Sequence, residues 1–296
     1  MSEIFSWLRK AENEKRTSVA GVPAPRIQVS EAPDFAGVSP DPEVNLPVKH
    51  PASERLEIQK GGWFDLGAAD PRIRKVLDPL SVVGEHYRLL RAKLSQMQKQ
   101  NGIKTLLVTS SIPAEGKTFT ACCLAGVFAQ EFGRRVLLID ADLRKPRAEY
   151  ELGIDRAGRP DGLSQVLRGE KVAEQVLLSS GKSDFFLLPS GPVPEDPAEL
   201  LSSPSLELTI QRMSQAFDWV VIDSPPVMAL ADASLIAPLC DATLLVVRAE
   251  KTPSKLVKES IERIGRNRIC GLLLNRSRRA KASNYYYHYY HRDRRS

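Results

Sequence analysis

The sequence predicts an α/β fold built on a doubly wound, mostly parallel sheet. Apolar runs of strand length alternate with segments of helical character, which is the pattern of strands joined by crossover helices. The runs are apolar at successive positions, as expected of strands that helices cover on both faces. With 296 residues and 42% hydrophobic content, the chain is large enough to bury such a core. A single domain of roughly 200 residues is therefore expected.

The elements follow one another in a regular order. The expected strands are KTLLVTS (104–110), RRVLLID (134–140), FFLLPS (185–190), DWVVID (218–223), ATLLVVR (242–248) and ICGLLLN (269–275). Helices are expected to begin at Lys117, near Pro197 and at Pro253. This alternation of strand and helix favours a sheet whose strands point the same way.

The composition divides the chain into four parts. Residues 1–16 predict a short amphipathic helix, because the apolar residues gather close to one helical face. Residues 17–70 are rich in proline and poor in aromatic residues, which predicts a flexible linker. The folded domain is expected over residues 71–275. Residues 276–296 form a basic tail that holds five of the seven tyrosines.

The formal net charge of +6 is concentrated in the tail. A charge excess placed there describes the tail rather than a nucleic-acid-binding face, so no nucleic-acid partner is expected, although anionic lipid is an alternative contact. The four cysteines lie in apolar runs without the spacing of metal ligands. No apolar run approaches about 20 residues, and the N-terminus is too charged for a signal peptide. We expect a soluble, cytoplasmic protein.

The segment TSSIPAEGKT (109–118) predicts a phosphate-binding loop, because it follows an expected strand and opens an expected helix. Gly116 allows close approach of the backbone, Lys117 reaches phosphate oxygens, and the hydroxyl of Thr118 suits Mg²⁺. Ser111 departs from the usual pattern, which has glycine there. The expected nucleotide-binding residues of this loop are Ser111, Pro113, Ala114, Glu115, Gly116, Lys117, Thr118 and Phe119.

Three aspartates end the neighbouring strands. Asp140 and Asp142 follow RVLLI, and Asp223 follows DWVVI. Any one of them alone is explained equally well as a helix cap. The carboxyl ends of parallel strands meet at one edge of a sheet, where ligands bind. Three carboxylates beside a phosphate loop therefore predict Mg²⁺ coordination and activation of a nucleophile.

At this point the sequence resembles the bacterial tyrosine kinases of capsular and exopolysaccharide synthesis. The resemblance runs from about Pro79 to the end of the chain. It is carried by SSIPAEGKT, LLIDADLRKP, VVIDSPP, LLPSGPVPEDPAELLSSP, the terminal tyrosines, and EHYRLLR with Glu85, Arg88 and Arg91. Relatives use the last pattern for ring-like self-assembly, whereas spacing alone indicates only three charges on one helix face.

The resemblance implies ATP-dependent autophosphorylation on tyrosine. Lys117 would neutralise the phosphates and Thr118 would bind Mg²⁺. Asp140 would be the general base, while Asp142 and Asp223 would hold the metal directly or through water. Asn275 matches a position that contacts adenine in related folds. Asp232 either shapes the crevice or caps a helix.

The tail would then be the substrate of a neighbouring subunit in a homo-oligomeric ring. The expected acceptors are Tyr285, Tyr286, Tyr287, Tyr289 and Tyr290. Phosphorylation would reverse the charge of the tail and dissolve the ring. A separate transmembrane activator would recruit the kinase to the inner face of the membrane and regulate polymerisation and export.

Two alternatives remain open at the level of sequence. ParA- and MinD-type ATPases share this deviant-Walker type of P-loop fold, but they carry a signature lysine where this chain has Ile112. A non-catalytic, nucleotide-binding adaptor of a polysaccharide export complex is the second alternative. The presence of Lys117, Thr118, Asp140 and Asp223 together argues against a pure scaffold.

Overall fold

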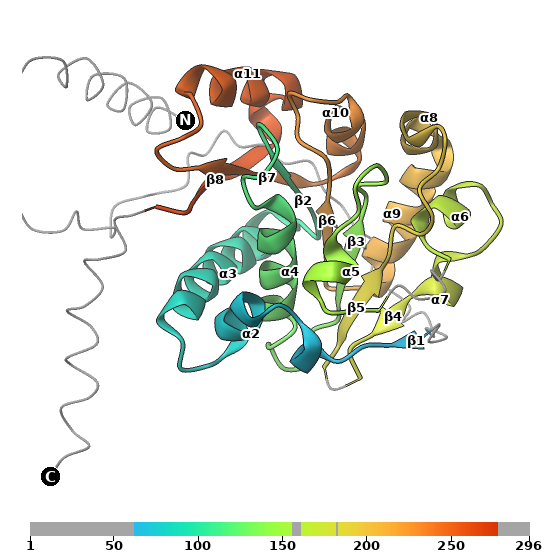
Figure 1. Ribbon diagram of the computed structural model, residues 1–296, viewed down its shortest axis with the longest axis horizontal. Helices are drawn as coiled ribbons and strands as arrows, with labels where there is room; N and C mark the ends of the chain where they lie inside the picture. The colour runs from blue at the N-terminus through green and yellow to red at the C-terminus, as the bar shows by residue number, and fades with distance from the viewer. Residues whose placement is uncertain (1–61, 156–160, 182, 278–296) are drawn as a thin grey trace, which may run out of the picture.

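The computed structural model of the chain describes residues 62–155, 161–181 and 183–277, and these residues form a sheet with helices on both sides (Figure 1). The amphipathic helix predicted over residues 1–16 and the tyrosines of the tail lie outside the described residues. The sheet has eight strands in the order β1-β4-β5-β3-β6-β2-β7-β8. All neighbours are parallel except β4 and β5, which are antiparallel.

Each long apolar run that predicted a strand forms one. The strands are β1 (Gly62–Trp63), β2 (Thr105–Ser110), β3 (Val136–Asp140), β4 (Leu178–Ser179), β5 (Phe185–Leu188), β6 (Trp219–Asp223), β7 (Ala242–Arg248) and β8 (Ile269–Asn275). The α-helices are α2 (Pro71–Leu77), α3 (Val82–Asn101), α4 (Lys117–Phe128), α5 (Ala148–Glu151), α6 (Leu163–Leu167), α7 (Ala173–Val176), α8 (Pro197–Ser202), α9 (Pro204–Ala216), α10 (Asp232–Ile236) and α11 (Ser254–Ile264). The short 3-10 turns are η2 (Leu66–Ala68), η3 (Ala237–Leu239) and η4 (Arg266–Arg268).

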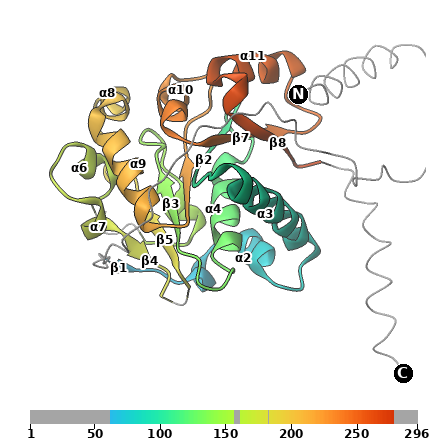
Figure 2. The ribbon, with the colours of Figure 1, turned by 180° about the vertical axis from the view of Figure 1, so that it is seen from behind.

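Successive residues of the central strands enter opposite hydrophobic cores. In β2, Leu107 packs with α6 to α11, whereas Leu106 and Val108 pack with α2 to α5. The same alternation continues in β3, β5, β6 and β7, because side chains of a strand point to opposite faces. Figure 2 shows the molecule from behind, with α2, α3 and α4 on one side of the strands and α6, α8 and α9 on the other. Helices on both faces confirm the doubly wound, mostly parallel fold.

The sheet extends further toward the N-terminus than the sequence predicts. The linker was expected to reach residue 70, but Gly62 pairs with Leu178 and Phe64 is buried against Phe185. Asp65 then caps a 3-10 turn over Leu66–Ala68. The prediction was wrong over residues 62–70, because a two-residue strand has no detectable periodicity.

The parallel order brings the ends of β2, β3 and β6 to one edge of the sheet. β2 lies between β6 and β7, and Asp140 and Asp223 are partners in the register of β3 and β6. The loops that leave these strands therefore share one edge with the start of α4. None of the helices in the described part of the chain has the length and apolar character needed to cross a membrane.

Candidate active site

The loop between β2 and α4 presents open backbone donors. Within the described residues, the N–H groups from Ala114 to Phe119 donate to no protein acceptor, and the first N–H bonded in the manner of a helix is that of Thr120, to the carbonyl oxygen of Gly116 at 2.9 Å. Six consecutive free N–H groups at the start of a helix attract an anion, because the helix dipole adds to their charge. This geometry suits the phosphates of a nucleotide.

Glycine is required at position 116 for two reasons. Gly116 has φ +96°, and a Cβ there would lie 2.2 Å from Nδ2 of Asn275. The amide of Asn275 approaches this closely because it donates to the carbonyl oxygen of Glu115 at 2.7 Å. Ser111, by contrast, replaces the usual glycine without a positive φ, and its Oγ is buried without a hydrogen-bond partner in the described structure. The departure from the usual pattern thus needs no unusual backbone.

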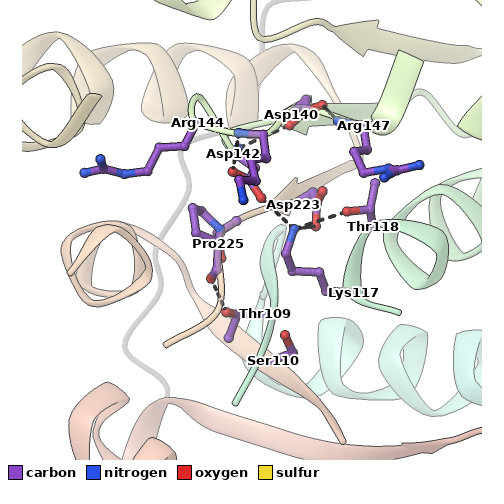
Figure 3. Close-up of polar contacts among 12 residues, drawn as sticks. Thr109, Ser110, Lys117, Thr118, Asp140, Asp142, Arg144, Arg147, Asp223 and Pro225 are labelled. Atoms are coloured by element: carbon purple, nitrogen blue, oxygen red, sulfur yellow. Dashed lines mark hydrogen bonds and ion pairs between the residues drawn. The ribbon is translucent and has the colours of Figure 1, made fainter. Parts of the chain in front are cut away.

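The ammonium of Lys117 lies close to the carboxylates of Asp142 and Asp223 (Figure 3). Its Nζ lies 2.8 Å from Oδ2 of Asp142 and 3.7 Å from Oδ1 of Asp223, and it donates to Oγ1 of Thr118 at 3.2 Å. Burial lowers the pKa of Lys117, but the attraction of Asp223 and Asp142 outweighs burial, so the pKa is raised. The ammonium is therefore retained at neutral pH beside the phosphate loop.

Asp140 is held by its own loop. Its Oδ2 accepts from the N–H groups of Ala148 at 2.9 Å and Arg147 at 3.1 Å, and its Oδ1 accepts from Asp142 at 3.2 Å. Burial, followed by repulsion from Asp223, raises the pKa of Asp140 to about 7. A carboxylate with a pKa near neutrality is well matched to proton transfer.

Asp223 is buried with unused oxygens. Neither oxygen accepts a hydrogen bond in the described structure, and the nearest cation is Lys117. Burial is the main cause that raises the pKa of Asp223 to about 6. Two orphaned oxygens beside the hydroxyl of Thr118 and the carboxylate of Asp142 fit Mg²⁺, which takes few protein ligands and completes its shell with water and phosphate.

Arg144, in the loop that follows β3, joins this loop to α10. Its guanidinium donates to both oxygens of buried Asp232, at 2.9 Å and 3.3 Å, and it points away from Lys117 in Figure 3. Asp232 was expected either to shape the crevice or to cap a helix. It caps none: Ala231 is the N-cap of α10, and no side chain bonds there.

The other predicted residues divide into two groups. Phe119 packs into the core between α4 and its neighbours, with the guanidinium of Arg72 5.2 Å from its ring, so only its N–H faces the phosphate loop. Pro113 and Ala114 are exposed on the outer part of the loop, where Ala114 has φ 65°. Asn275 lies against Gly116, beside the loop.

Glu85, Arg88 and Arg91 lie on α3, apart from this site. Arg88 pairs with Glu85 at 2.8 Å and donates to the carbonyl oxygen of Ser81 at 2.9 Å. Arg91 donates to the carbonyl oxygen of Val127 at 2.8 Å and pairs with Glu131. Both arginines therefore have partners within the chain, and the Glu85 side chain is the most exposed of the three, at 60%.

The sequence predicted Glu115 as a nucleotide-binding residue but gave no sign of the partners that hold its carboxylate, Arg248 and Thr252. Glu115 is 1% exposed, and its carboxylate accepts from the N–H groups of Ile112 and Arg248 and from the hydroxyl of Thr252. No motif indicates these partners, since two donors are backbone groups and Thr252 is 137 positions away.

Comparison with known proteins places the chain in a family. A family model described as an AAA domain matches residues 113–266. The chain is 35% identical over 213 residues to the tyrosine-protein kinase YwqD of Bacillus subtilis, covering 71% of this chain and 88% of the relative. It is 30% identical to the putative tyrosine-protein kinase CapB of Staphylococcus aureus, over 71% of this chain and 91% of CapB.

Solved structures agree with these relatives. The kinase domain of the Escherichia coli tyrosine kinase ETK matches with a TM-score of 0.65 and 28% identity, covering 74% of this chain and 90% of that chain. The septum site-determining protein MinD of Pyrococcus horikoshii, complexed with Mg-ADP, matches with a TM-score of 0.50 and 22% identity over 60% of this chain and 72% of that chain, and shares the fold alone. The chain therefore belongs to the family of bacterial tyrosine-protein kinases.

Proposed function

We propose that this chain is an ATP-dependent protein-tyrosine kinase that phosphorylates Tyr285, Tyr286, Tyr287, Tyr289 and Tyr290 in the tail of a neighbouring copy. The observation that carries the proposal is the meeting of six open N–H groups, the ammonium of Lys117 and three carboxylates at one edge of the sheet. Family membership supports the choice of tyrosine as acceptor.

The residues divide the work of phosphoryl transfer. The N–H groups of residues 114–119 bind phosphate oxygens, and Lys117 neutralises the charge that develops on the transferred group. Mg²⁺, held by Thr118 and by Asp142 and Asp223 directly or through water, supplies further charge neutralisation when bound. Asn275 lies beside the loop and is the proposed contact of the adenine ring.

Asp140 takes the proton of the acceptor. As the tyrosine oxygen forms its bond to the γ-phosphorus, its proton passes to the carboxylate of Asp140, and the bond to the β,γ-bridging oxygen breaks to leave ADP. The three N–H donors around Asp140 fix the direction in which its oxygens face. A pKa of about 7 lets the carboxylate accept and release a proton near neutral pH.

The wider biological role rests on the tail and on the family. The tail is basic, and each added phosphate brings about −1.5 to −2 charges, so a few phosphates would reverse its sign. We propose that this change dissolves a ring in which Glu85, Arg88 and Arg91 take part. A separate transmembrane activator would recruit the kinase from the cytoplasm to the inner face of the membrane, and the cycle would regulate polymerisation and export of capsule or exopolysaccharide.

The test is a phosphate-mapping experiment. Full-length protein is incubated with ATP and Mg²⁺, and phosphate is located by mass spectrometry, in parallel with Lys117→Met and a five-fold Tyr→Phe tail variant. Tyr150→Phe is the matched control, because Tyr150 is an exposed tyrosine outside the tail. Phosphate on the tail tyrosines of the wild type and of the control, and its absence in the Lys117 variant, is the expected result.

One other result would favour the ATPase alternative. ATP hydrolysis without phosphotyrosine, unchanged after addition of the activator's cytoplasmic segment, would contradict the kinase proposal and favour a MinD-like ATPase. A wild-type protein that binds ATP but neither hydrolyses it nor phosphorylates tyrosine would instead favour the non-catalytic, nucleotide-binding adaptor.

A further inference from the structure

Glu115 places a negative charge in a loop built for phosphates. Its carboxylate is turned to the back of the loop, where Oε2 accepts from the N–H of Ile112 at 2.9 Å and Oε1 accepts from the N–H of Arg248 at 3.0 Å. Oε1 also accepts from the hydroxyl of Thr252. A negative charge within a phosphate-binding loop disfavours an anionic ligand, so its presence calls for a compensating role.

The carboxylate joins three separate parts of the chain. Ile112 belongs to the phosphate loop, Arg248 ends β7, and Thr252 lies in the turn before α11. That turn is closed by its own bond, from the N–H of Thr252 to the carbonyl oxygen of Arg248 at 3.1 Å. Glu115 therefore ties the phosphate loop to a turn that already has a fixed shape.

The backbone of Glu115 makes a second tie, to β8. Its carbonyl oxygen accepts from Nδ2 of Asn275 at 2.7 Å, and the carbonyl oxygen of Asn275 accepts from the N–H of Ala249 at 2.9 Å. Gly116 is the N-cap of α4, so the N–H groups of the first helical turn, including that of Phe119, have no partner within the helix. The bond from Asn275 therefore fixes the position of the residue that precedes these open N–H groups.

We propose that Glu115 is a positioning residue for nucleotide binding. It holds the phosphate loop against the β7–α11 turn, and with Asn275 it fixes the position from which the open N–H groups of residues 114–119 meet the phosphates. The inference rests on the nucleotide site of the proposed function, but it does not depend on transfer to tyrosine.

Glu115→Gln tests the carboxylate directly. Glutamine has one acceptor oxygen and adds an N–H₂ group that faces backbone donors, so at least one of the three hydrogen bonds is lost. We expect the dissociation constant of a fluorescent ADP analogue, measured with Mg²⁺ on the full chain, to rise about ten-fold or more. The melting temperature is recorded alongside, to establish that the variant is folded.

Substitutions of Thr252 distinguish a positioning role of the Glu115 contact from an effect on overall stability. Thr252→Val removes the hydroxyl and should raise the dissociation constant about three- to ten-fold, whereas Thr252→Ser keeps the hydroxyl and should stay within about two-fold of wild type. Thr209→Val is the matched control, because its hydroxyl bonds only the carbonyl oxygen of Ser205 within α9. The loss of affinity in the Glu115→Gln, Thr252→Val double variant should be smaller than the sum of the two single losses in free energy, because both changes act on one group of contacts.

The outcomes are distinct. Wild-type affinity in folded Glu115→Gln and in Thr252→Val would overturn the inference, as would equal weakening by Thr252→Val, Thr252→Ser and Thr209→Val. If Glu115→Gln does not fold, the comparison of valine with serine at position 252 decides. A wild type that binds ADP but phosphorylates no tyrosine contradicts the proposed function only, and the affinities of the variants still decide the role of Glu115.

Discussion

The ammonium of Lys117 lies 2.8 Å from the carboxylate of Asp142 and so joins the start of α4 to the loop that leaves β3. The two residues come from different crossovers of the sheet, and each is almost fully buried in its side chain. The same ammonium is the nearest cation to Asp223. One charge therefore offsets the repulsion between the acidic ends of β3 and β6.

Removing that charge should abolish catalysis. In Lys117→Met, the transferred phosphoryl group loses its neutralising cation, and Asp142 loses its ion pair. We expect autophosphorylation to fall at least about 100-fold, measured as phosphotyrosine over time. Lys255→Met is the control, because its side chain is 86% exposed on α11. Activity within a few-fold of wild type in Lys117→Met would contradict the assignment.

Kinase activity should rise with pH. Asp140 must be ionised to accept the tyrosine proton, and its pKa of about 7 places that ionisation near neutrality. Initial rates between pH 5.5 and 8.5 should therefore increase through pH 7 and then level off. Asp140→Asn should lose activity about 100-fold or more and show no such rise. A wild-type rate that is flat over this interval would count against Asp140 as the base.

Asp223→Asn should stabilise the fold in the absence of nucleotide. The folded-state pKa of Asp223, about 6, exceeds the ordinary value of 3.8, so the folded protein binds this proton more tightly than the unfolded chain. The stability of the wild type therefore falls as pH rises from about 4 to above 6. Asparagine does not ionise, so the stability of the variant does not fall in this way. Its free energy of unfolding at pH 8 should exceed that of the wild type by about 1–3 kcal/mol.

Urea unfolding at pH 5 and pH 8 measures that difference. The advantage of Asp223→Asn should be smaller at pH 5, where the wild-type carboxylate is largely protonated, and kinase activity should be lost at both pH values. A variant that is less stable than wild type at pH 8 would show that Asp223 already stabilises the fold through Lys117.

The proposed ring makes separable predictions for the charges of α3. Glu85→Lys reverses an exposed charge and should lower the sedimentation coefficient of the assembly with a small effect on stability. Arg91→Ala should lower both the sedimentation coefficient and the stability of the fold, because Arg91 also joins α3 to Val127 in the last turn of α4 and to Glu131 beyond it. Lys99→Glu is the control at the far end of α3. Unchanged sedimentation of Glu85→Lys at working concentration would remove Glu85 from the contact.

The sequence was most informative where burial is complete. Strands such as Val136–Asp140 and Trp219–Asp223 are buried on both faces, so every position carries the apolar signal. β1 and β4 have two residues each, too few to show a period, and both were missed. The convergence of Asp140, Asp142 and Asp223 was predictable, because the ends of parallel strands meet at one edge.

The supporting contacts of the site were not predictable. The pair of Arg144 and Asp232 spans 88 positions, and that of Glu115 and Thr252 spans 137. Backbone N–H groups supply many of the donors, and every residue except proline has one, so residue type gives no signal. The sequence could mark the groups that face a ligand, but not the groups that hold them.

Asp140 and the phosphate loop differ in how far their supports lie along the chain. All three donors to Asp140 come from residues 142–148, whereas the back of the phosphate loop depends on Arg248, Thr252 and Asn275. The segment of residues 140–148 therefore contains everything that orients the Asp140 side chain. A single recombination event between homologous chains can transfer this segment whole. The phosphate loop must instead co-evolve with the C-terminal third of the domain, so chimeras joined between residues 118 and 248 should lose nucleotide affinity first.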